Sequence, residues 1–120
     1  MKIRLQEIEF GSTDVEKTKQ FYQTIFGFNT AVDQENLTVF TLETHTIDYN
    51  ISTHLPAKAT CISFLTDNLE EIIEKLHKNS IPFDGPQPSH LGMKSISFKD
   101  PDGNLLKVNE ATNSSPEWLK

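Results

Sequence analysis

Lys107 places an ammonium group inside an apolar stretch of the chain. The sequence there reads Leu105-Leu106-Lys107-Val108, and it follows an Asp-Pro-Asp-Gly-Asn segment typical of a tight turn. We expect a strand at 104–110, and the direction in which Lys107 points from it decides what kind of site the protein can have. A protonated lysine donates hydrogen bonds and repels cations, so it favours anionic or carbonyl groups.

Two glutamates and the single cysteine could also do chemistry. Glu7 and Glu9 fall on one face of an alternating strand expected at 3–10. Glu9 is a candidate general base because burial can shift the pKa of a carboxyl group. The alternatives are a solvated or an ion-paired side chain. Cys61 could be a thiolate ligand or a nucleophile. No histidine adjoins it in sequence, which favours an inert, buried thiol.

The histidines do not form a metal motif. No two of His45, His54, His77 and His90 have the spacing of a helical metal site. His77 falls on the exposed side of an expected helix. His90 lies in a loop before an expected strand at 93–99, and such a loop can overhang a cavity, so we include it as a candidate ligand contact.

A strand-and-helix pattern that occurs twice must position these residues. The first half has expected strands at 3–10, 28–34, 37–42 and 46–53, and the second at 61–66, 81–84, 93–99 and 104–110. A helix follows the first strand of each half, capped by Thr13 or Asp14 and by Asp67 or Asn68. In the first helix Val15, Phe21 or Tyr22, and Ile25 recur at helical spacing and are expected to face inward, and Gly27 ends the helix.

The two halves align, which indicates a repeated β-α-β-β-β unit. Ile62 stands 54 residues after Ile8, and Phe64 stands 54 residues after Phe10. We expect one domain over 1–120, with units at about 3–53 and 61–110, a polar linker at 54–60 and a tail at 111–120. One helix covers only one face of each sheet, so the other face must be covered or line a cavity.

Composition narrows the classes of function. The chain has 120 residues and a formal charge of −6, with scattered lysines and arginines, so we expect no nucleic-acid partner. No apolar run is long enough for a membrane span, and the alternating start is not a signal-peptide pattern. A single cysteine fits a reducing compartment, and we expect a cytoplasmic location.

Three segments give a resemblance to a known family. The stretch EIEFGSTDVEKTKQFYQTIFGF resembles the first unit of the vicinal oxygen chelate superfamily, which includes glyoxalases, extradiol dioxygenases and bleomycin resistance proteins. CISFLTDNLEEIIEKL resembles the start of its second unit, and DPDGN resembles its last hairpin turn. The resemblance covers about residues 3–110. It implies an α+β fold of two β-α-β-β-β units, whose curved mixed sheets surround a concave cavity with the helices outside.

The resemblance also implies where a divalent metal would bind in enzymes of the family. The matching positions are Glu7, then Asp48 or Asn50, then Cys61, and finally Lys107 in place of a common glutamate. The resemblance implies that Lys107 points into the cavity, while Leu106 and Val108 point to the core on the helix side. An ammonium group repels a cation, so we expect no metal and no cofactor. Since side chains at these positions should converge, we expect Lys107 to pair with Glu7 or Asp48. The expected cavity residues are Glu7, Glu9, Asp48, Asn50, Cys61, Ser63, His90 and Lys107.

Three functions are compatible with these residues. The preferred hypothesis is a metal-free protein that binds a small molecule in the cavity, similar to the bleomycin resistance branch. The second is a metal-dependent lyase, isomerase or dioxygenase of the glyoxalase type. The third is a dimeric module without a ligand. The sequence identifies neither the ligand nor a catalytic residue.

We predict a two-fold homodimer with composite cavities, because a chain this short leaves strand edges open and open edges invite pairing. Sedimentation velocity at micromolar concentration measures the mass of the particle. A single species of 13.6 kDa would contradict the prediction.

Overall fold

The computed structural model describes residues 1–41, 47–101 and 103–120 and divides the chain into two compact units. The first unit is Gln6–Cys61, and the second combines Met1–Leu5 with Ile62–Lys120. Residues 54–60, expected as a linker, belong to the first unit, in which Gly11 N donates to Ala59 O at 3.0 Å. The first residues of the chain cluster with its second half. His45 and the start of the strand expected at 46–53 lie outside the described residues, as does Asp102.

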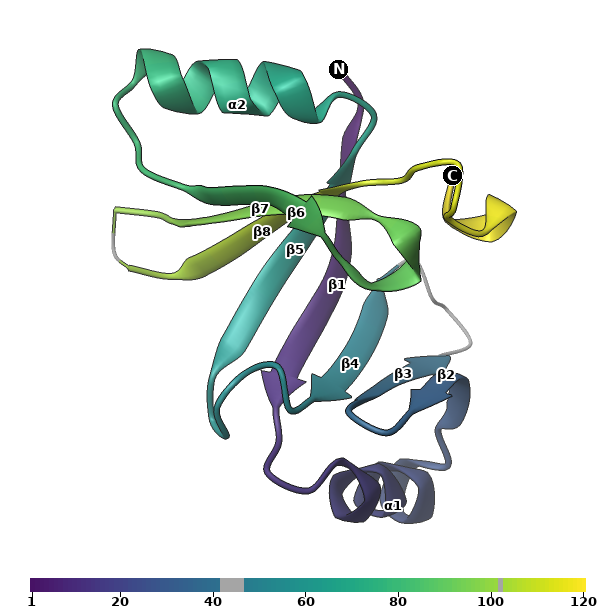
Figure 1. The fold of residues 1–120 in the computed structure, drawn as a ribbon. Helices are drawn as coiled ribbons and strands as arrows, with labels where there is room; N and C mark the ends of the chain where they lie inside the picture. The colour runs from purple at the N-terminus through teal and green to yellow at the C-terminus, as the bar shows by residue number, and fades with distance from the viewer. Residues whose placement is uncertain (42–46, 102) are drawn as a thin grey trace. The chain divides into compact units, whose positions relative to one another are not determined.

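The first unit contains one helix and most of four strands (Figure 1). The elements are β1 (Ile3–Gly11), α1 (Val15–Phe26), β2 (Asn29–Gln34), β3 (Leu37–Thr41) and β4 (Asp48–Ser52). β1 runs parallel to β4, and β3 is antiparallel to both β2 and β4, so the strands form a mixed sheet in the order β2-β3-β4-β1. The order of elements matches the expected β-α-β-β-β unit.

Helix α1 begins and ends where the sequence predicts. The side chain of Asp14 accepts a hydrogen bond from Lys17 N at 3.1 Å, which satisfies one of the free N–H groups at the start of the helix. Gly27 ends the helix in the left-handed conformation, with φ of 68°. The same side-chain cap recurs at the start of the helix in the second unit, where Asn68 accepts from Glu71 N, and this supports the repeat inferred from the sequence.

The inward face of α1 differs from the expectation. Tyr22 packs into the core around Val15, Phe40 and Ile51. Phe21, the alternative to Tyr22, is 54% exposed, and Ile25, expected to face inward, is 61% exposed. Consecutive helical residues point about 100° apart, so the inward ring of Tyr22 turns Phe21 toward the surface. The expectation that Ile25 is buried was therefore wrong.

The second unit repeats this arrangement with the remaining elements. They are β5 (Thr60–Thr66), α2 (Leu69–Lys78), β6 (Asp84–Pro88), β7 (Lys94–Lys99) and β8 (Leu105–Glu110), with short 3-10 helices at His90–Gly92 and Glu117–Leu119. β5 is parallel to β8, and β7 is antiparallel to β6 and β8. The predicted α+β class, with mixed strands and two helices, is confirmed.

Strand β6 lies later in the chain than expected. The sequence predicted it at 81–84, but it runs over Asp84–Pro88 and contains two prolines. It comes last in the strand order, and proline is tolerated in an edge strand because its missing N–H can face outward. The local sequence does not show that β6 is an edge strand, so it does not predict a strand that contains prolines.

Helix α2 covers one face of the second unit. Asn68 caps it by accepting from Glu71 N at 3.2 Å, and Leu69, Ile73 and Leu76 pack on Ile96 and Val108. Within the described ranges, no helix is both long and apolar enough to cross a bilayer.

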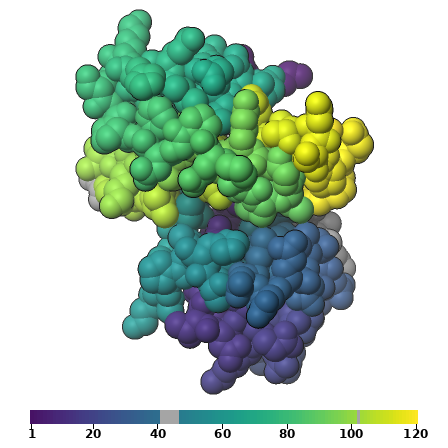
Figure 2. Space-filling view, viewed as in Figure 1, coloured from purple at the N-terminus to yellow at the C-terminus, as the bar shows by residue number. Residues whose placement is uncertain are grey.

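The C-terminal tail, yellow in Figure 2, lies against green residues of its own unit. There Leu119 is buried beside Leu65 and Met93, so the tail contributes to the core.

The core of the first unit generates a prediction about its two tyrosines. Tyr49 Oη donates to Tyr22 Oη at 2.9 Å. Two causes raise the pKa of Tyr49 well above its usual value of 10.0: burial is the larger, and this hydrogen bond is the next in size. Since the folded state keeps the phenol neutral, its contribution to stability is complete below pH 10 and falls as the pH rises beyond it.

We therefore expect part of the tyrosine absorbance change to come late in an alkaline titration of the folded protein. The chain has only two tyrosines, so Tyr22→Phe leaves Tyr49 alone and removes its hydrogen-bond partner. In that variant the pKa of Tyr49 should fall but stay above that of free tyrosine, because burial persists. If both tyrosines of the folded wild type titrate together like free tyrosine, the pKa of Tyr49 is not raised and the prediction is wrong.

Candidate functional site

The face of the first unit that turns away from α1 carries buried acidic and polar side chains. In the register of β1 and β4, Glu7 lies beside Asp48 and Glu9 beside Asn50. Their neighbours along the strands, such as Phe10 and Ile51, pack in the core under α1, and alternation places the polar residues opposite. We name Glu7, Glu9, Asp48, Asn50 and Ser52 the acidic face, and all five are buried. The sequence correctly placed Asp48 and Asn50 on one strand face.

Hydrogen bonds hold the carboxylates of the acidic face. Asn50 Nδ2 donates to Glu7 Oε2 at 2.7 Å, and the Ser52 hydroxyl donates to Glu9 Oε2. His54 Nδ1 lies 3.8 Å from the same Glu9 oxygen. Glu9 is 4% exposed, so a solvated carboxylate is excluded, whereas the ion-paired alternative agrees with the position of His54.

The contact with Glu7 fixes the orientation of the Asn50 amide. A carboxylate only accepts hydrogen bonds, so the amino group of Asn50 must face it. The amide oxygen Oδ1 is buried, and no hydrogen-bond partner for it occurs among the described residues. A buried acceptor without a partner costs free energy. Asn50 Oδ1 is therefore a buried acceptor that a further hydrogen-bond donor would satisfy.

The face of the second unit that turns away from α2 carries Lys107. Lys107 lies beside Ser63 on β5 and beside Ser97 on β7. Val108, the next residue on β8, packs in the core beneath α2. The predicted orientation of Lys107, opposite to Val108, agrees with this alternation. Ser63 is buried, and its hydroxyl has no hydrogen-bond partner within the described part of the chain.

Lys107 contacts residues of the loop after β6. Its Nζ donates to Ser89 Oγ at 2.9 Å, and Ser89 Oγ lies 3.3 Å from His90 Nδ1. An ammonium group can only donate, so the Ser89 hydroxyl accepts from Lys107. The imidazole tautomer of His90 sets which of Ser89 and His90 donates in the second contact. We name Lys107, Ser89 and His90 the lysine cluster. Lys107 and His90 were candidates from the sequence, and the fold brings them together through Ser89.

The remaining predictions about site residues have mixed outcomes. Cys61 is 3% exposed, which agrees with a buried thiol. The predicted pairing of Lys107 with Glu7 or Asp48 would join residues of the two units, and it stays a prediction. Sequence reasoning missed Ser52 and Ser89. Alternation along β4 could have found Ser52, but Ser89 lies outside any regular strand pattern, so nothing local marks it.

These residues do not fit a metal centre. Among the described residues, no group of three or more histidine, cysteine, aspartate or glutamate side chains is placed to hold a metal ion. Asn50 turns its amino group, not its oxygen, toward Glu7. Amino hydrogens at that point donate to the carboxylate, but they cannot coordinate a cation that the carboxylate binds. The acidic face is therefore built as a hydrogen-bonded network.

The acidic face generates a prediction about the coupling of Glu7 and Asn50. Asn50→Ala removes a donor to a buried carboxylate, so we expect a loss of about 1.5–3 kcal/mol of unfolding free energy. Glu7→Gln removes the charge, and in that background Asn50→Ala should cost less. Urea unfolding of the two single variants and the double variant measures the coupling. Asn29→Ala, at an exposed position of β2, is the control and should change stability by less than about 0.5 kcal/mol. Additive effects of the two changes would contradict a direct interaction.

Known proteins resemble this chain in sequence and in fold. A curated protein from Lysinibacillus sphaericus (strain C3-41), named metallothiol transferase FosB, is 26% identical over 116 residues, covering 90% of this chain and 82% of the relative. Among solved structures, the methylmalonyl-CoA epimerase of Mycobacterium tuberculosis superposes with a TM-score of 0.73 at 10% identity, covering 96% of this chain and 90% of that one.

A further solved structure carries the family name itself. The glyoxalase/bleomycin resistance protein/dioxygenase superfamily member from Vibrio splendidus 12B01 gives a TM-score of 0.67 at 16% identity, covering 91% of this chain and 99% of that one. At these identities the structures show a shared fold. The family model for the Glyoxalase/Bleomycin resistance protein/Dioxygenase superfamily matches residues 4–108. With the repeated β-α-β-β-β units described above, this match shows that the chain belongs to the Glyoxalase/Bleomycin resistance protein/Dioxygenase superfamily.

Proposed function

We propose that this protein binds a small molecule through its polar strand faces and does so without a metal. The observation that carries the proposal is the chemistry of Lys107. The family resemblance implies a metal-ligating carboxylate at this position, and here an ammonium group donates to Ser89. A cation cannot share that position with an ammonium group, but an anion or a carbonyl oxygen can accept from it.

The lysine cluster supplies the recognition of such a group. Lys107 donates only one of its three hydrogens in the contact with Ser89, so it can donate to a ligand oxygen as well. His90, half-buried beside Ser89, adds a second ring nitrogen that can donate or accept. A compact ligand with a carboxylate or carbonyl group fits this set of donors.

The acidic face supplies a different chemistry. Asn50 Oδ1 is an unused acceptor, and the carboxylates of Glu7 and Glu9 accept hydrogen bonds as well. Apolar side chains stand beside them on the same face of the sheet, because Leu37 is in register with Ser52 and Val39 with Asn50. Ligand sites are mostly apolar with a few placed polar groups, and this face has that composition.

Metal-dependent chemistry is the alternative with a specific observation in its favour. The relative at 26% identity is named a metallothiol transferase, and its match covers 90% of this chain. A transfer reaction of that kind would need ligands other than the ammonium group of Lys107. A dimeric module without a ligand is the third possibility, and it predicts that no small molecule stabilises the protein.

We expect compact carboxylates or carbonyl compounds to raise the melting temperature of wild-type protein but not of Lys107→Gln. A ligand at one hundred times its Kd stabilises the folded state by about 2.7 kcal/mol. The measurement is a thermal-shift screen of small carboxylates, each paired with its neutral amide. Lys99→Gln removes the same charge from an exposed position on β7 and should behave like wild type.

Elemental analysis of protein purified without chelators separates the alternatives. The proposal expects much less than one divalent metal per chain. One bound metal per chain that is lost in Glu7→Gln would contradict the proposal and favour metal-dependent transfer chemistry. A screen without any stabilising compound, on protein free of metal, would favour the module without a ligand.

A further inference from the structure

The second unit contains a cavity of about 730 Å³ that shares no residue with the lysine cluster or the acidic face. Its apolar lining includes Leu65, Ala111 and Leu119. Leu119 is 2% exposed and packs with Leu65 and Met93, so the apolar wall is a fixed part of the core. Small-molecule sites usually measure about 300–1,000 Å³, and this cavity falls in that range.

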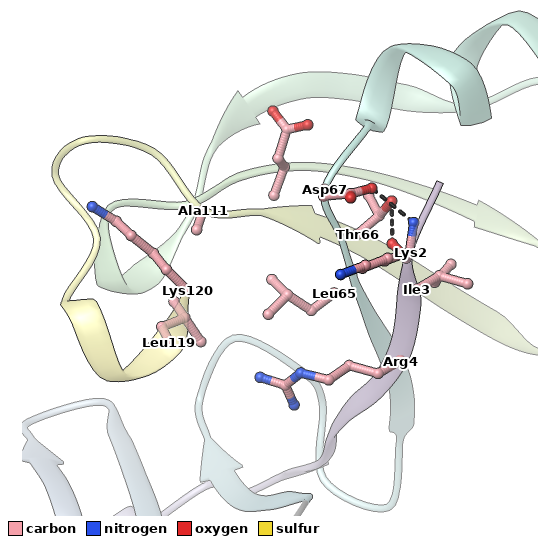
Figure 3. A pocket seen from close by; sticks show the side chains of 10 residues that line it. Lys2, Ile3, Arg4, Leu65, Thr66, Asp67, Ala111, Leu119 and Lys120 are labelled. Atoms are coloured by element: carbon pink, nitrogen blue, oxygen red, sulfur yellow. Dashed lines mark hydrogen bonds between the residues drawn. The ribbon is translucent and has the colours of Figure 1, made fainter.

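Two cationic side chains enter this cavity from the start of β1. Lys2 N donates to Asp67 Oδ1 at 2.8 Å, and Thr66 Oγ1 donates to Lys2 O at 3.1 Å, which ties the beginning of the chain to the end of β5. Residues two apart on a strand share a face. Figure 3 shows the side chains of Lys2 and Arg4 extending to the side where Leu65 and Leu119 lie, while Ile3 points the other way.

The acidic residues of the lining already have partners. Asp67 accepts from the backbone of Lys2. Glu110 Oε1 accepts from Leu69 N at 2.9 Å, and its Oε2 lies 2.9 Å from Lys94 Nζ. Within the described part of the chain, neither the ammonium group of Lys2 nor the guanidinium group of Arg4 forms an ion pair. The cavity therefore combines an apolar wall with two cationic side chains, Lys2 and Arg4, that form no ion pair among the described residues.

We propose that this cavity binds an amphipathic carboxylate, with its hydrocarbon part on Leu65 and Leu119 and its carboxylate on Arg4 and Lys2. The planar guanidinium group matches a carboxylate with two parallel hydrogen bonds, and an ammonium group adds a further donor. The apolar wall selects against small inorganic anions, since these bury no hydrocarbon. This site is separate from the one in the proposed function, and it takes a longer and more apolar ligand.

Isothermal titration of the full chain with octanoate tests the proposal, and octanamide is the neutral probe of equal length. We expect one octanoate per chain and weaker binding of octanamide. Arg4→Gln should weaken octanoate by about tenfold or more, because it removes a charge-assisted pair. Ala111→Phe fills the cavity without changing a charge and should also abolish binding. Circular dichroism confirms that each variant is folded.

Two matched variants locate the site. Lys99→Gln removes a positive charge outside the cavity and should keep the wild-type affinity for octanoate. Lys17→Gln removes a positive charge from the exposed side of α1 in the first unit and should keep it too. Equal affinity for octanoate and octanamide, equal effects of Arg4→Gln and Lys99→Gln, or no binding of octanoate at millimolar concentration would each overturn the proposal.

Discussion

The strand faces that no helix covers are the constraint on which the rest of the structure depends. Each unit has one helix, and this helix covers one face of the strands with apolar side chains. The opposite face is largely buried although it carries carboxylates, amides and hydroxyls. Burying such groups costs free energy unless they are hydrogen-bonded, so their contacts are tightly specified.

The two units meet this constraint with opposite charges. On the acidic face, amide and hydroxyl donors from β4 satisfy the carboxylates of β1. In the lysine cluster, a hydroxyl from the loop after β6 satisfies the ammonium group. Asn50 Oδ1 and Ser63 Oγ are among the buried atoms without a hydrogen-bond partner within the described residues. Because satisfied groups have little to gain from a ligand, these two atoms and the spare hydrogens of Lys107 would contact the small molecule that we propose.

Membership of the superfamily gives the fold but does not decide the chemistry. This fold hosts a transferase by name in one relative and an epimerase by name in a structural neighbour. Function depends on the side chains of a site and not on the fold that carries them. The polar strand faces of this chain carry an ammonium group and an amide whose amino group faces a glutamate, and this set is suited to hydrogen bonding.

The sequence by itself determined the repeat, the element types and the points at which both helices begin, because these follow from local periodicity and capping chemistry. It placed β6 too early, put Ile25 inside and left the inward aromatic ring as Phe21 or Tyr22. An edge strand and the choice of one inward aromatic ring are decided by neighbours that are distant in the chain. Only the tertiary structure brought Ser89 to Lys107 and the tail residue Leu119 to the cavity beside Arg4. Such contacts join segments that no local pattern relates, and they form because buried polar groups need partners and apolar surface needs cover.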